Sequence, residues 1–181
     1  WTTDHAVTLI LDTPDADDLT SAQTNYIKAY VQSMENAIYA DRASGWSSRH
    51  YLDYLDRDSW IDFHLLNVFA KNPDAFIAST YLTKDRNGKL MAGPVWDFDR
   101  ASGSADSRSL PWDEWHDSDD QDPWDYGWWG QLAHDPDFMQ AWVDRWQSLR
   151  TTTFSDQNLA ALADDLAAQI GPEAASRDSA Q

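Results

Sequence analysis

The sequence predicts an α+β fold that is mostly helical and contains one central β-hairpin. Several stretches place apolar residues three and four positions apart, which puts them on one helical face, and each begins at a capping residue. The middle of the chain, residues 76–96, instead consists of two apolar strands around a turn. A small strand pair between helical segments is typical of an α+β domain.

The first two helices are predicted before the hairpin. Thr20-x-x-Gln23 is a capping box, so a helix should run from Thr20 to about Ala40. Its apolar stripe comprises Ile27, Tyr30, Val31, Met34 and Ile38. Ser59 is expected to open a second helix, which should end near Asn72-Pro73 because the residue before a proline avoids the α region. The apolar residues expected to be buried by this helix are Ile61, Leu65, Leu66 and Phe69.

Two more helices are predicted after the hairpin. Asp135-Pro136 has the chemistry of a helix start, and Ser155 should cap the last helix. Gly171-Pro172 should end that helix, so the polar tail to residue 181 is expected to be irregular. The stripe of the last helix that is expected to face inward comprises Leu159, Leu162, Leu166 and Ile170.

The hairpin is predicted from strands at residues 76–83 and 89–96. The link between them contains Asn87-Gly88, a pair that strongly predicts a tight turn because both residues accept its positive φ angles. If these two residues form the loop, Arg86 faces Lys89. This count sets the register of the whole strand pair.

Two aspartates follow from this register. Counting outward from the turn places Asp97 opposite Ala78, or opposite Phe76 if the turn centre moves by one residue. Asp74 then lies at the same end of the ladder, roughly 5–13 Å from Asp97 at about 3.3 Å per residue. The sequence therefore predicts two carboxylates at one end of a rigid hairpin.

Several kinds of chemistry use such a pair. In phosphoryl transfer one aspartate orients a hydroxyl nucleophile and another holds Mg²⁺ on the phosphates, and protein kinases place the two at the ends of a short hairpin. Glycoside hydrolysis also needs two carboxylates. Alternatively, Asp74 caps a turn, and Asp97 and Asp99 are ordinary acids at a strand end. The pair alone does not decide among these.

The longer pattern around the pair resembles the CotH-type spore-coat kinase family. The most specific parts are the Asn-Pro-Asp motif at residues 72–74 and the Gly-Pro-Val-Trp-Asp-Phe-Asp motif at residues 93–99. Further matching stretches lie at residues 19–31, 59–67, 79–82, 84–85, 88–89 and 129–150. The resemblance covers about residues 10–170. It implies the C-terminal-lobe portion of an atypical, secreted protein-kinase-like fold with a central β-hairpin.

The resemblance also implies roles for individual residues. Asp74 resembles the catalytic aspartate of the family, and Asn72 in the same motif could position it. Asp97 resembles the aspartate that binds Mg²⁺ and ATP, and Asp99 could be a second ligand of the metal and nucleotide. Ser79 departs from the family pattern, which has an asparagine there near the metal. A hydroxyl is the weaker ligand, so this departure bears on metal affinity.

Length and charge add further expectations. The chain of 181 residues starts at Trp1 and is expected to be a single-domain fragment, residues 1–181, of a longer protein whose N-terminal lobe is missing. That lobe would carry the cation for the nucleotide phosphates, so the fragment alone should be a weak or inactive kinase. With 13 Lys and Arg against 31 Asp and Glu, the net charge of −18 disfavours nucleic-acid partners and suits a salt-rich or extracellular setting. We expect an extracellular or cell-surface location in a bacterium.

Other residue types exclude further classes of site. The absence of cysteine excludes disulfides and thiolate metal sites. The five histidines show no metal-ligand spacing, and His64 on a helical face is expected to be structural. No run of apolar residues is long enough to span a membrane.

The leading hypothesis is thus Mg²⁺-dependent phosphoryl transfer from ATP to Ser or Thr hydroxyls of a protein substrate. The alternative is a non-catalytic extracellular or cell-surface module on the same scaffold that binds carbohydrate through tryptophans. The tryptophans of that possible platform are Trp112, Trp115, Trp124, Trp128 and Trp129. A two-carboxylate glycosidase is a third hypothesis.

Overall fold

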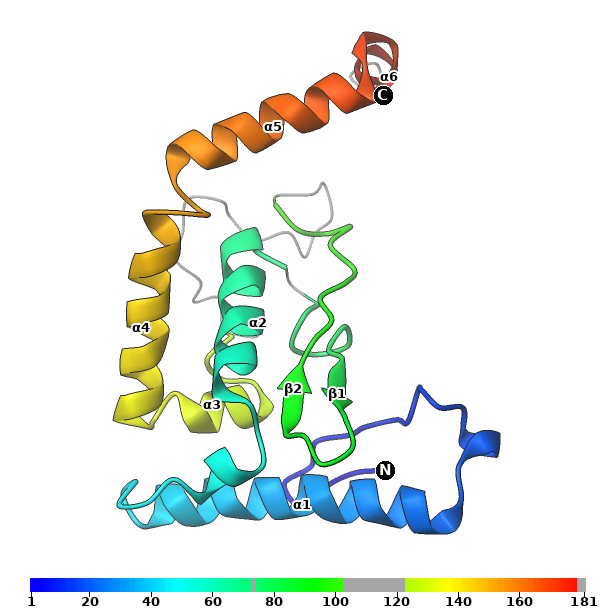
Figure 1. Ribbon diagram of the computed structural model, residues 1–181, viewed down its shortest axis with the longest axis vertical. Coiled ribbons are helices and arrows are strands. Elements are labelled where there is room, and N and C mark those ends of the chain that lie inside the picture. The colour runs from blue at the N-terminus through cyan, green and yellow to red at the C-terminus, as the bar shows by residue number, and fades with distance from the viewer. Residues whose placement is uncertain (73, 103–122, 179–181) are drawn as a thin grey trace. The chain divides into compact units, whose positions relative to one another are not determined.

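The computed structural model describes residues 1–72, 74–102 and 123–178 (Figure 1). The chain forms two compact units, Trp1–Ala141 and Trp142–Gln181. Its elements are η1 (Ala16–Asp18), α1 (Ser21–Ala43), η2 (His50–Asp53), α2 (Arg57–Ala70), β1 (Leu82–Lys84), β2 (Leu90–Ala92), α3 (Gly127–Leu132), α4 (Pro136–Arg150), α5 (Asp156–Ile170) and α6 (Pro172–Asp178). The predicted α+β, mostly helical class with one antiparallel hairpin is confirmed.

Helix α1 begins where its capping box predicts. The Thr20 side chain accepts a hydrogen bond from the Gln23 backbone N–H, and the Gln23 side chain accepts one from the Thr20 backbone N–H. The helix runs to Ala43, a few residues further than expected. Its predicted stripe forms the buried face, with Val31, Met34 and Ile38 in the core and Ile27 and Tyr30 half-buried.

Helix α2 begins at a different residue from the one predicted. Asp56, not Ser59, is the N-cap, because the Asp56 carboxylate accepts from the Ser59 backbone N–H at 2.9 Å. A carboxylate at this position also complements the positive end of the helix dipole. The helix ends at Ala70, and Lys71 takes a left-handed conformation with φ 55°. The predicted stop just before residues 72–73 is therefore correct.

Aromatic rings around α2 fill the core of the first unit. Trp60 on α2 and Trp129 on α3 pack with ring centroids 4.6 Å apart. The ring centroids of Phe63 and Trp129 are 5.5 Å apart. Two residues predicted to be buried lie on the edge of this core, since Leu66 is half-buried and Phe69 is exposed. Ile61 and Leu65, the other two residues of the predicted stripe, are buried as expected.

The hairpin is shorter than predicted, and its register differs. The paired residues are Leu82 with Ala92, Thr83 with Met91 and Lys84 with Leu90. This register rules out the predicted pairing of Arg86 with Lys89. The last bond of the ladder runs from the Gly93 N–H to the Tyr81 carbonyl at 2.9 Å. Pro94 follows and has no N–H to donate, so the ladder ends there instead of continuing to residue 96.

Hydrogen bonds attach the hairpin to the start of α2. The Leu90 N–H donates to the Tyr54 carbonyl at 2.7 Å, and the Leu90 carbonyl accepts from the Asp56 N–H at 2.9 Å. The Trp60 indole N–H donates to the same carbonyl at 3.0 Å. Strand β2 and α2 thus form one block, and Figure 1 shows the hairpin running beside the helix.

The C-terminal helices begin as predicted, but the tail that follows α5 differs from the prediction. The Asp135 carboxylate accepts from the Asp137 N–H at 3.1 Å at the start of α4, and the Ser155 side chain caps α5. Gly171 ends α5, yet α6 follows where an irregular tail was expected. The α5 stripe expected to face inward is wrong: Leu162, Leu166 and Ile170 are exposed. An apolar stripe marks a face that can pack but supplies no partner for it.

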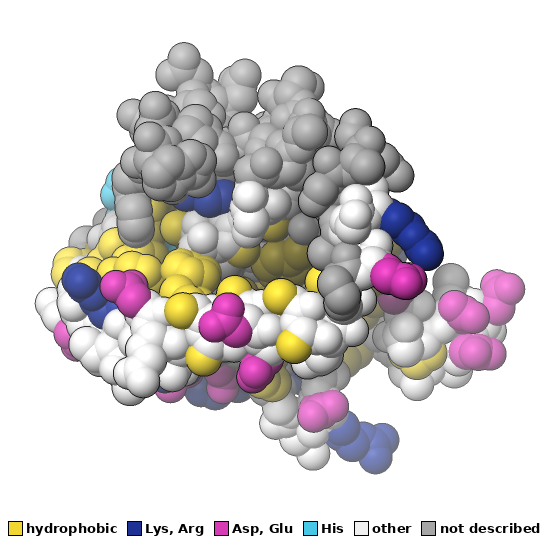
Figure 2. Space-filling model, turned by 90° about the horizontal axis from the view of Figure 1, so that it is seen from above, with side chains coloured by type: hydrophobic (Ala, Val, Ile, Leu, Met, Phe, Trp, Pro, Cys, Tyr) yellow, Lys and Arg dark blue, Asp and Glu magenta, His cyan; other side chains and the backbone are white. Residues whose placement is uncertain are grey.

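The surface carries the strong negative charge of the sequence. Figure 2 shows acidic side chains scattered over one face, with lysine and arginine between and around them. In the part of the chain that the structure describes, every helix is too short or too polar to cross a membrane.

Candidate functional site

Asp74 lies on a tight turn directly after α2. The Asn72 backbone N–H donates to the Asn67 carbonyl at 3.0 Å, which continues the helical end by one more bond. The Asp74 carbonyl then accepts from the backbone N–H groups of Ile77, Ala78 and Ser79 at 3.3, 3.1 and 3.0 Å. The turn therefore holds the Asp74 backbone at a fixed point beside the helix, with its side chain partly exposed.

The side chain of Asn72 connects this turn to the Trp-Asp-Phe-Asp segment. Its Nδ2 donates to the Asp97 carbonyl at 3.2 Å and to Asn67 Oδ1 at 3.2 Å. Its Oδ1 accepts from the Asp74 backbone N–H at 3.3 Å. Asn72 is only 4% exposed, so these bonds lie away from water. One buried amide thus joins the two segments that carry the predicted carboxylates.

Ser79 makes a second connection between the same segments. Its Oγ donates to Asp97 Oδ2 at 2.9 Å, while its backbone N–H donates to the Asp74 carbonyl. Asp97 itself has a φ of 62°, an uncommon value for a residue with a side chain. The Ser79 hydroxyl orients the Asp97 carboxylate, which is a different role from the direct metal ligand suggested by its position in the family pattern.

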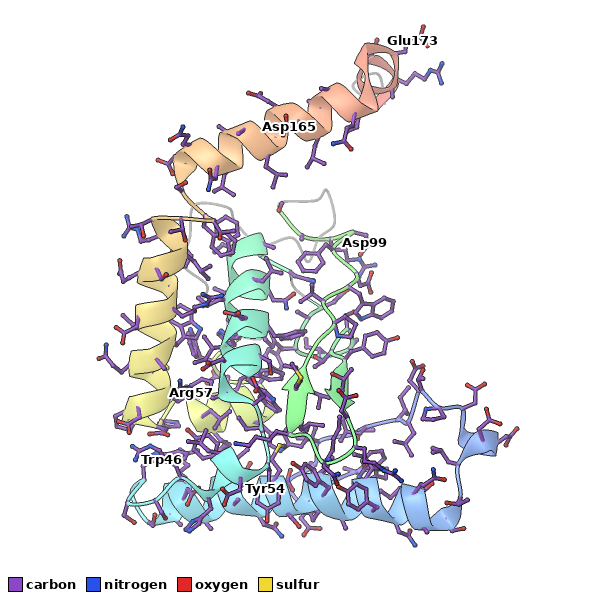
Figure 3. All side chains as sticks on the ribbon, viewed as in Figure 1. Trp46, Tyr54, Arg57, Asp99, Asp165 and Glu173 are labelled. Carbon is purple, nitrogen blue, oxygen red and sulfur yellow. The ribbon has the colours of Figure 1, made fainter. Side chains whose placement is uncertain are left out.

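The structure brings Asp74 and Asp97 together, but not through the predicted strand ladder. Residues 74–78 form turns, so neither Ala78 nor Phe76 faces Asp97 across a ladder. The link runs instead through Asn72 and Ser79. Asp99 remains outside this network: its side chain is exposed and makes no hydrogen bond or ion pair with the described residues. Figure 3 shows Asp99 on the loop after β2, well away from Arg57 at the start of α2.

Arg100 is a site residue that sequence reasoning missed. Its Nη1 lies 3.3 Å from Asp74 Oδ2, and the guanidinium is 32% exposed. The signal in the sequence was its position directly after the Trp-Asp-Phe-Asp motif.

The donor set suits Mg²⁺ held together with phosphate oxygens. Within the described residues, no three or more His, Cys, Asp and Glu side chains gather into a metal site. Mg²⁺ in nucleotide enzymes uses one or two carboxylates and completes its shell with phosphate oxygens and water. The exposed, oriented carboxylate of Asp97 fits such a partial site, and Asp99 nearby in the chain could add a second oxygen.

Most of the proposed tryptophan platform lies in the core or outside the described residues. Trp128 and Trp129 are buried, so their prediction as exposed stacking residues is wrong. Trp124 is half-buried, and its ring centroid lies 4.2 Å from the ring centroid of His64. Trp112 and Trp115 lie outside the described residues. The carbohydrate-binding alternative thereby loses much of its predicted surface.

His64 is structural, as predicted. It is fully buried, and its Nε2 is 3.2 Å from the Pro123 carbonyl. Burial lowers the pKa of His64 to about 3, with the Pro123 bond opposing that shift. The imidazole is therefore neutral at physiological pH and packs as part of the core.

The whole pattern, and not only the carboxylate pair, is shared with one family of proteins. The family model described as CotH kinase protein matches residues 1–181, the full length of the chain. No significant match was found among the curated proteins or the solved structures. The match spans both the Asn72–Asp74 turn and the Asp97 segment that Asn72 connects, and on this basis the chain belongs to the CotH kinase protein family.

Proposed function

We propose that this chain takes part in Mg²⁺-dependent phosphoryl transfer from ATP to Ser or Thr hydroxyls of a protein, as the C-terminal-lobe portion of a kinase-like fold. The observation that carries the proposal is the Asn72 side chain. It bonds to the Asp74 N–H and to the Asp97 carbonyl, and so holds two carboxylate-bearing segments at the end of α2. Membership of the CotH kinase protein family supports the same reaction class.

The two carboxylates take different roles in this proposal. Asp74, partly exposed on its turn, accepts a hydrogen bond from the acceptor hydroxyl and orients its oxygen for attack. Asn72 keeps the Asp74 backbone in place. Asp97, oriented by the Ser79 hydroxyl, would hold Mg²⁺ with help from Asp99. When bound, Mg²⁺ neutralises charge on the phosphate oxygens and fixes the nucleotide.

The experiment is transfer of labelled γ-phosphate from ATP to a Ser-rich protein, using the longest form of the protein that can be produced. Asp74→Asn should lower turnover by about 10²-fold or more, because the hydroxyl loses its acceptor. Asp97→Asn should abolish Mg²⁺-dependent transfer. Asp85→Asn removes the same charge from the exposed hairpin turn and should leave transfer unchanged.

Transfer that survives both the Asp74 and the Asp97 substitution would contradict the proposal. Equal losses in all three variants would also contradict it, because a general effect of charge would then explain the result.

A further inference from the structure

The loop that carries Arg100 is fixed to the end of α2 at two points. On one side, Asn72 Nδ2 donates to the Asp97 carbonyl at 3.2 Å. On the other, the Ser102 N–H donates to the Ala70 carbonyl at 2.8 Å. A third bond, from the Ala101 N–H to the Phe98 carbonyl at 3.1 Å, tightens the loop between them. Arg100 lies inside this short span, so its backbone is held beside the Asp74 turn.

The guanidinium of Arg100 therefore lies beside the Asp74 carboxylate. Its Nη1 is 3.3 Å from Asp74 Oδ2. With 32% of its side chain exposed, Arg100 is also accessible to a ligand that enters from solvent. The geometry describes a partly exposed cation beside the Asp74 carboxylate.

A site for polyphosphate needs such a cation in this protein more than in most. The net charge of −18 repels a nucleotide, and Asp74, Asp97 and Asp99 add negative charge at the site itself. A guanidinium has five N–H donors in a planar fork, which matches carboxylate and phosphate oxygens equally well. Arg100 can thus contact Asp74 and a phosphoryl oxygen with different nitrogens of the same group.

Building on the proposed function, we infer that Arg100 is an anion-binding residue of this site, which holds Asp74 in the free protein and contacts phosphoryl oxygens of the bound Mg²⁺–nucleotide. This places a phosphate-binding cation within the chain itself, on the loop that follows the proposed metal ligands. The ligand class is a polyphosphate, and the nucleobase takes no part in the contact.

The test is calorimetric titration of this chain with ATP and with inorganic tripolyphosphate, each in the presence of Mg²⁺. Arg100→Gln should weaken both affinities by about 10-fold or more, because a charge-assisted hydrogen bond is lost. Arg100→Lys keeps the charge but lacks the planar fork of donors. Its affinities should fall between those of the original chain and those of Arg100→Gln. Arg57→Gln is the matched control: Arg57 is partly exposed, pairs with Asp58 at the other end of α2 and carries the same charge. Its affinities should stay within about twofold of the original.

The possible failures can be told apart. If the original chain binds both ligands and Arg100→Gln binds them equally well, the inference is overturned while the proposed function stands. A loss for ATP with no loss for tripolyphosphate would overturn it too, because the contact would then be with the nucleoside. If the original chain binds neither ligand, the inference is overturned, while the proposed function is decided separately by the phosphoryl-transfer experiment on the longest form of the protein. Circular dichroism melts of each variant exclude loss of folding as the cause.

Discussion

The buried amide of Asn72 makes three hydrogen bonds at the candidate site. It donates to Asn67 Oδ1 and the Asp97 carbonyl and accepts from the Asp74 N–H. An alanine could replace none of these bonds, and at 4% exposure water has little access to the groups that would be left. The same residue therefore supports local folding and the relative position of the two aspartates.

Asn72→Ala should lower the free energy of unfolding by about 1–3 kcal/mol, because buried polar groups lose their partners. Urea denaturation followed by tryptophan fluorescence measures this change. Asn36→Ala, on the exposed face of α1, is the control and should change stability by less than about 0.5 kcal/mol. A loss for Asn72→Ala no larger than that of the control would show that the amide contributes little to the site.

Sequence reasoning at this scale identified the residue types but not every role. Asp74 and Asp97 stand in recognisable motifs, so both could be named in advance. The role of Ser79 could not, because its hydroxyl acts through a bond to a residue 18 positions away. The contact of Arg100 with Asp74 spans 26 positions and depends on how the loop after β2 folds back. A local sequence pattern does not encode contacts between residues so far apart along the chain.

Glu35 is the residue that joins three separate elements of the first unit. From its buried position on α1 it accepts from the Thr3 hydroxyl at 2.6 Å, the His5 N–H at 3.1 Å and the Trp128 indole N–H at 3.0 Å. Gln32 adds a fourth bond from the same helix. Burial works to raise the pKa of Glu35, but these hydrogen bonds outweigh it and leave the pKa below its ordinary value.

The lowered pKa fixes the sign of a pH effect. An ionised Glu35 stabilises the folded protein at any pH above its unfolded value of 4.5, and this stabilisation is lost as the pH falls through the lower folded value. Glu35→Gln should therefore reduce the free energy of unfolding by about 1–3 kcal/mol at pH 7. The difference from the original protein should shrink below about pH 4.5.

Urea titrations between pH 3.5 and pH 8 would measure that difference. Glu173→Gln is the control, because Glu173 is exposed on α6, where it pairs with Arg177 at 3.7 Å. A difference for Glu35→Gln that stays constant over the whole range would mean that its charge has no part in joining the N-terminal segment, α1 and α3.

Element boundaries could be predicted where a local signal fixes them. The capping box of α1, the Asp135-Pro136 start of α4 and the Ser155 cap of α5 are short-range chemistry, and all three are confirmed. The hairpin was harder, because the turn centre determines every pair and Asn87-Gly88 allows more than one centre. Whether the α5 stripe is covered depends on packing, which periodicity does not contain.

The net charge of −18 acts on the molecule as a whole. Like charges are closer together in the folded state than in the unfolded chain, so mutual repulsion lowers folding stability. Salt screens this repulsion, with a Debye length that falls from about 30 Å at 0.01 M to about 3 Å at 1 M. The acidic side chains spread over the surface in Figure 2 are the groups affected.

The Tm at pH 7 should therefore rise by several degrees as NaCl increases from about 0.01 to 1 M, measured by differential scanning calorimetry. The control is the same series near pH 4.2, the isoelectric point, where the repulsion is small and the rise should largely vanish. A Tm that falls with salt at pH 7 would show that attractive ion pairs, such as Arg49 with Asp135 at 2.9 Å, outweigh the net repulsion.

In the proposed function, the two carboxylates joined through Asn72 have separate roles toward nucleotide and acceptor. Calorimetric titration of ATP into Asp97→Ala and Asp74→Ala, with and without Mg²⁺, separates these roles. Asp97→Ala should abolish Mg²⁺-dependent binding, because the metal loses its protein ligand. Asp74→Ala should bind with a Kd within about threefold of the original, because Asp74 acts on the acceptor hydroxyl. Equal loss of binding in both variants, or no loss in either, would contradict the account.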